Sequence, residues 1–233
     1  MRLPPLIEGR LIRRYKRFLA DVELQDGSLI TAHTPNTGRM RGLTTPGNRV
    51  WLRDSANPGR RYRYSWVLVE TELGVRVGID TGLANALVRE AIEEGTVSSL
   101  RGYRRIRQEV RYGEERSRID LLLQDGPAPD CFVEVKNVTL MEDGIARFPD
   151  AVTERGRKHL RELERRVAAG QRGAVFFCIQ RADAEAFRPA DHIDPDYAEA
   201  LTRARDRGVE ALAWRCSVSP RAIRIDRELP IEA

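Results

Sequence analysis

SRIDLLLQDGPAPDCFVEVK, residues 117–136, holds two strand-like apolar runs on either side of a turn rich in glycine and proline. Side chains alternate across a strand, so Glu134 and Lys136 point to the same face of the sheet. If the two runs pair as a hairpin, Asp120 comes to lie beside Glu134. The stretch therefore predicts that two carboxylates and one ammonium group converge at the edge of a sheet.

This combination of groups suits phosphodiester hydrolysis. Asp120 and Glu134 would hold Mg²⁺ or Mn²⁺ with water in the remaining positions, and the metal would lower the pKa of a bound water. Lys136 would orient or deprotonate that water, or stabilise the reacting phosphate. Only three of the 40 basic residues are lysines, which favours a need for a compact ammonium group at position 136. The alternative is that the three residues form an ordinary surface ion pair.

The elements around this stretch indicate a known kind of core. After residue 80, the periodicity predicts the order α-β-β-β-α-β and then α-β, and the first six elements have the order of the PD-(D/E)-x-K nuclease core. Asp150 is the expected N-cap of the second helix, and Gly156 would let that helix approach the sheet closely. The predicted elements are helices at 84–92, from 150 and at 194–208, and strands at 104–112, 118–123, 131–135, 174–179 and 209–214.

The first 80 residues contain short strand-like runs about ten residues apart, separated by turn residues. This spacing predicts a small all-β barrel, and a five-stranded barrel of the OB type fits the number of runs. We therefore predict a mixed α and β protein, with an OB-like barrel at 1–80 and a nuclease-like domain with a central mixed sheet at 81–233. The predicted barrel strands are 18–24, 28–34, 49–53, 64–70 and 73–79.

The net charge of +5 is concentrated in the predicted barrel. Residues 1–80 hold 14 Lys or Arg against 8 Asp or Glu, whereas residues 81–233 hold 26 against 27. A basic barrel suits a polyanion such as DNA, although an ordinary solvated basic face is the alternative. Phosphate contacts read no bases, so no sequence preference is expected. The candidate DNA-binding residues are Arg13, Arg14, Lys16, Arg60 and Arg61, next to aromatic residues that can stack on bases.

Other polar residues are candidates for supporting roles. Glu90, on the first predicted helix, is a candidate catalytic acid that could reach the edge of the sheet where the metal would bind. Glu109, on the first strand of the core, is a candidate acid next to the metal ligands. For Glu90 a solvated helix charge is an equal alternative. The second helix carries candidates for phosphate contact near its N-terminus, for which solvent exposure is the favoured alternative. They are Thr153, Arg155, Lys158 and His159.

Several protein classes are disfavoured. No apolar run approaches the roughly 18 residues of a membrane span, and residues 1–10 lack the apolar core of a signal peptide, so a cytoplasmic location is expected. Cys131, Cys178 and Cys216 form no C-x-x-C pair, so they are predicted to be buried core residues and not zinc ligands. The signatures of phosphate loops and dinucleotide-binding folds are missing.

Six longer motifs are more specific: LIRRYKRFLADV (11–22), PNTGRM (35–40), EVRYG (109–113), SRID (117–120), EVKNVTL (134–140) and FPDAVTERG (148–156). They resemble the sugar fermentation stimulation protein A family, nearly from end to end of the chain. The resemblance implies an OB-like barrel, a PD-(D/E)-x-K nuclease-like domain, DNA binding with little sequence selectivity, and a regulatory role in the use of sugars, maltose in particular. The family's acidic and lysine positions fall on Asp120, Glu134 and Lys136. Thr34 and Leu43 stand where many members have cysteine.

We expect a DNA-binding protein with a Mg²⁺-dependent nuclease-type active site. The alternative is a non-catalytic DNA-binding regulator of sugar metabolism genes, and metal-dependent cleavage that Asp120→Ala abolishes would distinguish the two. An RNA-processing factor is a third hypothesis, because OB barrels also bind single-stranded RNA. No membrane partner is expected, and the oligomeric state stays open, a homodimer included.

Overall fold

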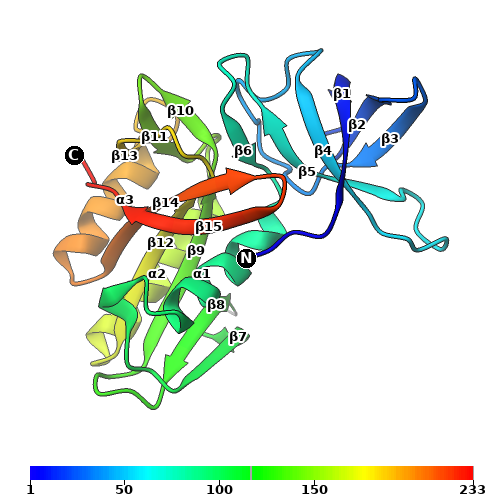
Figure 1. The fold of residues 1–233 in the computed structure, drawn as a ribbon. Helices are drawn as coiled ribbons and strands as arrows, with labels where there is room; N and C mark the ends of the chain where they lie inside the picture. The colour runs from blue at the N-terminus through cyan, green and yellow to red at the C-terminus, as the bar shows by residue number, and fades with distance from the viewer. Residues whose placement is uncertain (116, 233) are drawn as a thin grey trace.

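The computed structural model describes residues 1–115 and 117–232, which form a β-barrel followed by an α/β domain (Figure 1). Five strands close the barrel in the order β3-β2-β1-β4-β5, and a short parallel pairing between β3 and β5 completes the ring. The predicted OB-like barrel is therefore confirmed. Its strands are β1 (Leu6–Tyr15), β2 (Leu19–Leu24), β3 (Leu29–His33), β4 (Arg49–Asp54) and β5 (Tyr64–Glu70), and β6 (Arg76–Gly78) pairs with the end of β5 outside the ring.

Strand β1 does not follow from the hydrophobic periodicity. Its register against β2 shifts between Leu11 and Arg13, which breaks the alternation of inward and outward side chains. Leu11 is buried in the barrel core, whereas Ile12 is 38% exposed. The basic residues at 13–17 therefore belong to the end of a barrel strand and the turn after it. The last run, predicted at 73–79, forms only the short β6.

A six-stranded mixed sheet forms the second domain, in the order β15-β14-β12-β9-β8-β7. Strands β9, β12 and β14 are parallel, and antiparallel strands extend the sheet at both edges. The predicted α-β-β-β-α-β order is confirmed. The elements are α1 (Ala84–Glu93), β7 (Arg105–Tyr112), β8 (Ser117–Gln124), β9 (Cys131–Val138), α2 (Glu154–Ala168), β12 (Arg172–Ile179), α3 (Pro195–Asp206), β14 (Glu210–Ser219) and β15 (Ala222–Glu228), with a small side sheet of β10 (Leu140–Glu142), β11 (Ile145–Phe148) and β13 (Ala186–Pro189) and 3-10 turns at Thr81–Leu83 and Ser98–Leu100.

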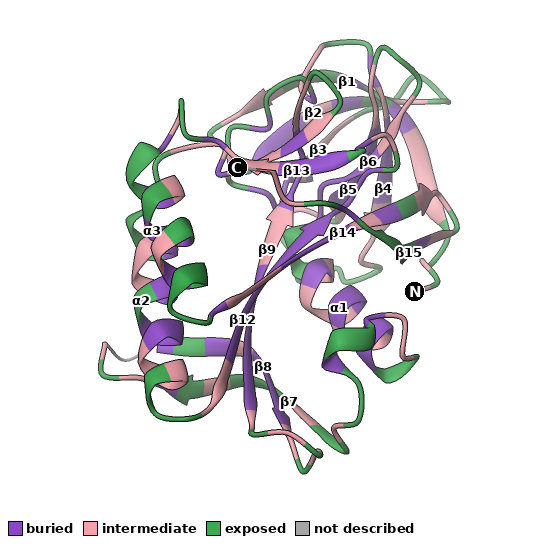
Figure 2. Ribbon diagram, turned by 90° about the vertical axis from the view of Figure 1, so that its left-hand side faces the viewer, coloured by how far each residue is buried: buried purple, intermediate pink, exposed green. Residues whose placement is uncertain are grey.

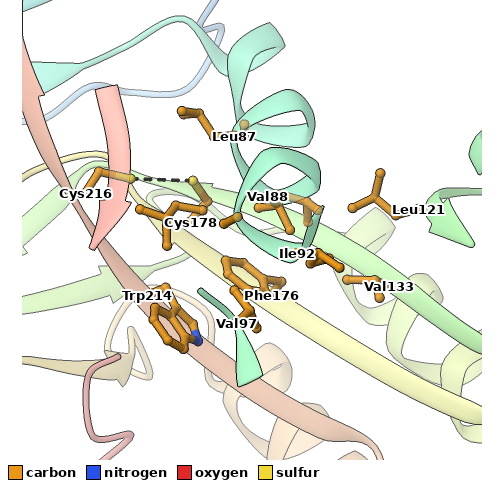
Figure 3. Close-up of a cluster of buried hydrophobic side chains, with 14 of the residues drawn as sticks. Leu87, Val88, Ile92, Val97, Leu121, Val133, Phe176, Cys178, Trp214 and Cys216 are labelled. Atoms are coloured by element: carbon orange, nitrogen blue, oxygen red, sulfur yellow. Dashed lines mark hydrogen bonds between the residues drawn. The ribbon is translucent and has the colours of Figure 1, made fainter. Parts of the chain in front are cut away.

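Helix α1 covers one face of this sheet, and helices α2 and α3 cover the other (Figure 2). On the α1 side, Leu87, Val88 and Ile92 pack over the apolar side chains of β9, β12 and β14 (Figure 3). Burial of these side chains fixes the helix against the sheet. Among the described residues, no helix combines the length and apolar character that a membrane crossing requires.

The three cysteines are free and buried, as predicted. Cys178 on β12 and Cys216 on β14 lie in the cluster beneath α1, with their sulfur atoms 4.0 Å apart (Figure 3). Cys131 lies in the same cluster. All three behave as small apolar core residues.

Helix α2 begins later than predicted. Thr153, and not Asp150, is the N-cap, because the Thr153 hydroxyl accepts a hydrogen bond of 3.0 Å from the backbone N–H of Gly156. Asp150 instead accepts a hydrogen bond of 3.3 Å from the backbone N–H of Met40 in the barrel. Gly156 does allow a close approach, but the neighbour is α3 and not the sheet, since an added Cβ would lie 2.9 Å from the ring of Tyr197.

Backbone hydrogen bonds also tie the barrel to the second domain. The backbone N–H of Gly78 in β6 donates a hydrogen bond of 2.8 Å to the carbonyl of Gln180. Before β1, the N–H of Leu3 donates one of 2.9 Å to the carbonyl of Arg221, at the β14–β15 turn. These contacts hold one end of the barrel at the C-terminal ends of β12 and β14.

Candidate active site

Strands β8 and β9 bring the two predicted carboxylates together. Their antiparallel register, continued by one residue beyond the last pair, sets Asp120 opposite Glu134. At this point a side chain takes the place of a backbone carbonyl as the acceptor, because the N–H of Val135 donates a hydrogen bond of 2.7 Å to Oδ2 of Asp120. The amide of Asn85, on α1, donates one of 3.0 Å to Oδ1. Asp120 is thus held between the sheet and the first helix.

Glu134 is almost fully buried, with 3% of its surface exposed. Its Oε1 accepts a hydrogen bond of 2.7 Å from the Lys136 ammonium and also contacts Nδ1 of His159, on α2. Lys136 Nζ lies 3.2 Å from the same ring nitrogen. Within the described part of the chain, Oε2 of Glu134 is buried and has no hydrogen-bond partner. A buried carboxylate oxygen left in this way is costly without a cation or a donor.

The two carboxylates have opposite pKa shifts. Burial and then the charge of Glu134 raise the pKa of Asp120 to about 6, although hydrogen bonds from Val135 and Asn85 oppose the rise. Burial also acts to raise the pKa of Glu134, but the Lys136 charge and the contact with His159 outweigh it, so this pKa lies below its usual value. At neutral pH both groups are mainly negative and repel one another, so a cation bound beside them would relieve this repulsion.

The carboxylates open into a pocket of about 440 Å³ that both domains line. Its walls include the Asp120–Glu134–Lys136 group, His159 and Arg155 from α2, and the barrel turn of residues 36–38. The Asn36 side chain folds that turn by accepting a hydrogen bond of 2.8 Å from the N–H of Gly38. The barrel therefore forms one side of the candidate site.

The donor chemistry fits a small hard cation. Two carboxylates with water in the remaining positions is the usual arrangement for Mg²⁺. The described residues contain no group of three or more His, Cys, Asp or Glu that could hold a metal, so an ion here would depend on Asp120 and Glu134 among the acidic side chains. The bare Oε2 of Glu134 is the atom that such an ion would satisfy.

The structure puts the candidate supporting acids elsewhere. Glu90 forms an ion pair with the amino group of Met1, and it is not among the described residues that line the pocket. Asn85, five residues earlier on α1, is the residue that reaches the carboxylates, through its hydrogen bond to Asp120. Glu109 is exposed on β7 and has a left-handed backbone, with φ of 53°. The geometry therefore brings neither Glu90 nor Glu109 to the two carboxylates.

Of the four candidates on the second helix, two line the pocket and two do not. Thr153 caps the helix, and the Lys158 ammonium donates to the carbonyl of Glu115. Arg155 and His159 do line the pocket, with Arg155 Nε 3.4 Å from Nε2 of His159. His159 is 5% exposed and not a solvated side chain, so the favoured alternative for this residue was wrong.

The candidate DNA-binding residues lie at one end of the barrel. The pairings Leu19↔His33 and His33↔Ser65 bring the β1–β2 turn and the β4–β5 loop to the same end. Lys16 lies in the first and is exposed, as are Arg60 and Arg61 in the second.

Arg13 and Arg14, at the end of β1, have different surroundings. Arg13 is exposed, although it pairs with Asp21 at 2.8 Å. Arg14 is partly buried, and its guanidinium donates hydrogen bonds of 2.9 Å to the carbonyls of Asn36 and Gly38. It thus supports the turn that lines the pocket and is not free to meet a ligand.

Three pocket residues were missed by sequence reasoning. No sequence pattern distinguishes Asn85 from the other residues of its helix. Asn36 lies in a segment that was interpreted only as a turn between strands. Asn137 follows Lys136 directly, and its Oδ1 accepts a hydrogen bond from the Gln180 amide. The available signal was the motifs 35–40 and 134–140, which contain two of these asparagines.

Comparison with known proteins gives matches over almost the whole chain. Residues 12–79 match the family model of the SfsA N-terminal OB domain, and residues 82–222 match that of the sugar fermentation stimulation protein RE domain. Sugar fermentation stimulation protein homologs from Pelobacter propionicus and Geobacter metallireducens are 62% and 59% identical, each over 99% of both chains. The solved structure of Pyrococcus furiosus SfsA in complex with Ca²⁺ is 31% identical, with a TM-score of 0.88 over 100% of this chain and 98% of that one.

Proposed function

The chain belongs to the sugar fermentation stimulation protein family, and from that premise we propose that it binds DNA and hydrolyses its backbone with the help of a divalent metal ion. The observation that carries the proposal is the pair of carboxylates at the point where the pairing between β8 and β9 ends. Asp120 is held in place by two hydrogen bonds, and Glu134 keeps one buried oxygen without a partner. A cation bound between the two carboxylates would give that oxygen a partner.

Asp120 and Glu134 would hold the ion, Mg²⁺ or Mn²⁺, which supplies charge neutralisation at the phosphate and a more acidic bound water. The presence of Ca²⁺ in the Pyrococcus furiosus protein supports a divalent ion in this family. Mg²⁺ has the same preference for oxygen ligands.

The ammonium of Lys136 lies 2.7 Å from Glu134 and 3.2 Å from His159. Held in this way, it would donate to a phosphate oxygen or orient the attacking water. Arg155 and the amide of Asn137 line the same pocket and would bind the remaining phosphate oxygens. A cluster of this kind binds the charge of any phosphodiester and discriminates little between sequences.

DNA would reach this pocket along the barrel. Lys16 and the Arg60–Arg61 pair lie in exposed loops at one end of the barrel, and Arg17 in the β1–β2 turn donates a hydrogen bond of 3.1 Å to the carbonyl of Thr37, which lines the pocket. The β1–β2 turn therefore lies next to the wall of the pocket. OB barrels use these two loops to contact nucleic acids.

The test is a cleavage assay with supercoiled plasmid and with linear single strands, in Mg²⁺, Mn²⁺ or EDTA. We expect metal-dependent nicking by the native protein and none by Asp120→Ala or Lys136→Ala. Glu185→Ala, an exposed acid of the same domain, is the control. DNA that is bound but uncut by native protein and variants alike would favour the non-catalytic regulator.

A further inference from the structure

Two arginines face each other across the β7–β8 hairpin. Arg111 and Arg118 are direct partners in the antiparallel register, so their Cα atoms are about 5 Å apart. Both side chains are exposed. Like charges at directly opposite positions destabilise a strand pair by several tenths of a kcal/mol, so this arrangement weakens the hairpin unless an anion binds there.

The acidic residues nearby are engaged elsewhere. Glu115, in the turn of the same hairpin, pairs with Arg161 and Arg165 of α2 at 3.2 and 3.1 Å. Glu114 also approaches Arg165, at 3.8 Å. Within residues 1–115 and 117–232, neither Arg111 nor Arg118 forms an ion pair with a carboxylate. The two guanidinium groups keep their hydrogen-bonding capacity for an external partner.

The pair borders a hollow of about 690 Å³, lined by Arg111, Tyr112, Gly113, Ser117 and Arg118. Side chains alternate across a strand, so Tyr112 and Ser117 point to the opposite face from the two arginines, and Tyr112 packs in a core cluster. The two exposed guanidinium groups at the hollow suit the oxygens of a phosphate group, to which arginine binds in a bidentate manner.

The hollow is close to the candidate active site. Arg118 precedes Asp120 by two residues on β8, so their Cα atoms are about 6.7 Å apart. A nucleic acid strand whose phosphate lay at Asp120 and Glu134 would carry its neighbouring phosphates past this position. The motif 109–113, which contains Arg111, is not otherwise used by the proposed site, and Arg118 shares the motif 117–120 with Asp120.

We propose that Arg111 and Arg118 together bind one backbone phosphate of the nucleic acid, next to the phosphate held at the carboxylates. The ligand assigned here rests on the proposed function. The pair adds affinity and fixes the register of the strand on the site, and it contributes no base recognition because it contacts only the backbone.

The test is binding of a fluorescein-labelled 30-nucleotide DNA, single-stranded and duplex, measured by anisotropy in Ca²⁺ over a range of salt concentrations. We expect Arg111→Ala/Arg118→Ala to bind about 10- to 100-fold more weakly and to lower the slope of log K against log salt by about 1, the value for one lost phosphate contact. The matched control is Arg104→Ala/Arg105→Ala, which removes the same charge from the other end of the same hairpin, where both side chains contact Asp125.

Thermal unfolding of the same variants distinguishes binding from structure. Loss of the like-charge pair should leave the melting temperature of Arg111→Ala/Arg118→Ala unchanged or raised. An equal salt slope in the native protein and this variant would overturn the inference while leaving the proposed function intact. Failure of the native protein to bind DNA at all would instead overturn the proposed function.

Discussion

The backbone N–H of Val135 donates a hydrogen bond of 2.7 Å to the carboxylate of Asp120, at the point where pairing between β8 and β9 ends. Here a side-chain carboxylate accepts the kind of hydrogen bond that backbone carbonyls accept in the rest of the strand pairing. The contact fixes Asp120 beside Glu134 before any ligand binds. The repulsion between the two negative charges is therefore already present in the folded protein.

Replacement of Asp120 by Asn should therefore stabilise the metal-free protein. The folded-state pKa of Asp120 is about 6, against an ordinary value of 3.8. Between these pH values the folded state binds a proton that the unfolded state has lost, so stability falls as pH rises from 4 to 6. We expect Asp120→Asn to raise the free energy of unfolding by about 1–3 kcal/mol at pH 7.5, and the difference to vanish near pH 4, as measured by urea unfolding in EDTA. A less stable variant at pH 7.5 would contradict this account.

Binding of a divalent ion should weaken in acid. A metal and a proton compete for Asp120, so affinity should fall roughly tenfold for each pH unit below about 6. Calorimetric titration with Mn²⁺ at pH 5, 6 and 7.5 measures this. Glu134→Gln should abolish the binding, and removal of the metal with EDTA should abolish cleavage. Equal affinity at pH 5 and 7.5 would exclude Asp120 as a ligand.

Arg14 and Lys16 should behave differently, although the sequence assigned both to DNA contact. Arg14→Ala removes charged hydrogen bonds to two backbone carbonyls of the barrel turn and should cost about 2–3 kcal/mol of stability. Lys16→Ala should leave the melting temperature unchanged and weaken DNA binding in a salt-dependent way. Differential scanning calorimetry and anisotropy on both variants check the contrast, and a stable Arg14→Ala that has lost DNA binding would restore the original assignment.

Gly38→Ala should impair cleavage more than folding. An added Cβ would collide with the Asp150 carboxylate and lie 2.9 Å from Oδ1 of Asn36, so the turn would shift within the pocket wall. We expect at least a tenfold loss of cleavage rate and a drop in melting temperature of a few degrees. Gly59→Ala, in an exposed loop of the same barrel with only Asn57 at 3.3 Å, is the control and should change neither.

The barrel, the mixed sheet and the Asp120–Glu134 juxtaposition were predictable because each depends on a local period or on a hairpin register. Strand β1 was not, since its bulge between Leu11 and Arg13 breaks the period. Strand β15 does alternate, with Ile223 and Ile225 buried, but it lies beyond the nuclease core order that guided the prediction.

The missed site residues depend on contacts between elements far apart in the sequence. Asn85, which was missed, reaches Asp120 over a separation of 35 residues, and His159, for which solvent exposure was favoured, reaches Glu134 over 25. A side chain on a helix has the same local pattern whether it meets solvent or a buried carboxylate. Glu90 was chosen as an acidic residue of the first helix that could reach the metal, and only the packing of α1 against the sheet brings Asn85 there instead.

The turn at 36–38 belongs to the barrel but borders the carboxylates of the other domain. Substitutions in the barrel can therefore change what the pocket accepts while the metal ligands and the sheet that carries them stay untouched. Relatives that have diverged in substrate should differ first in this turn, and exchanging it between two of them would transfer a preference without rebuilding either domain.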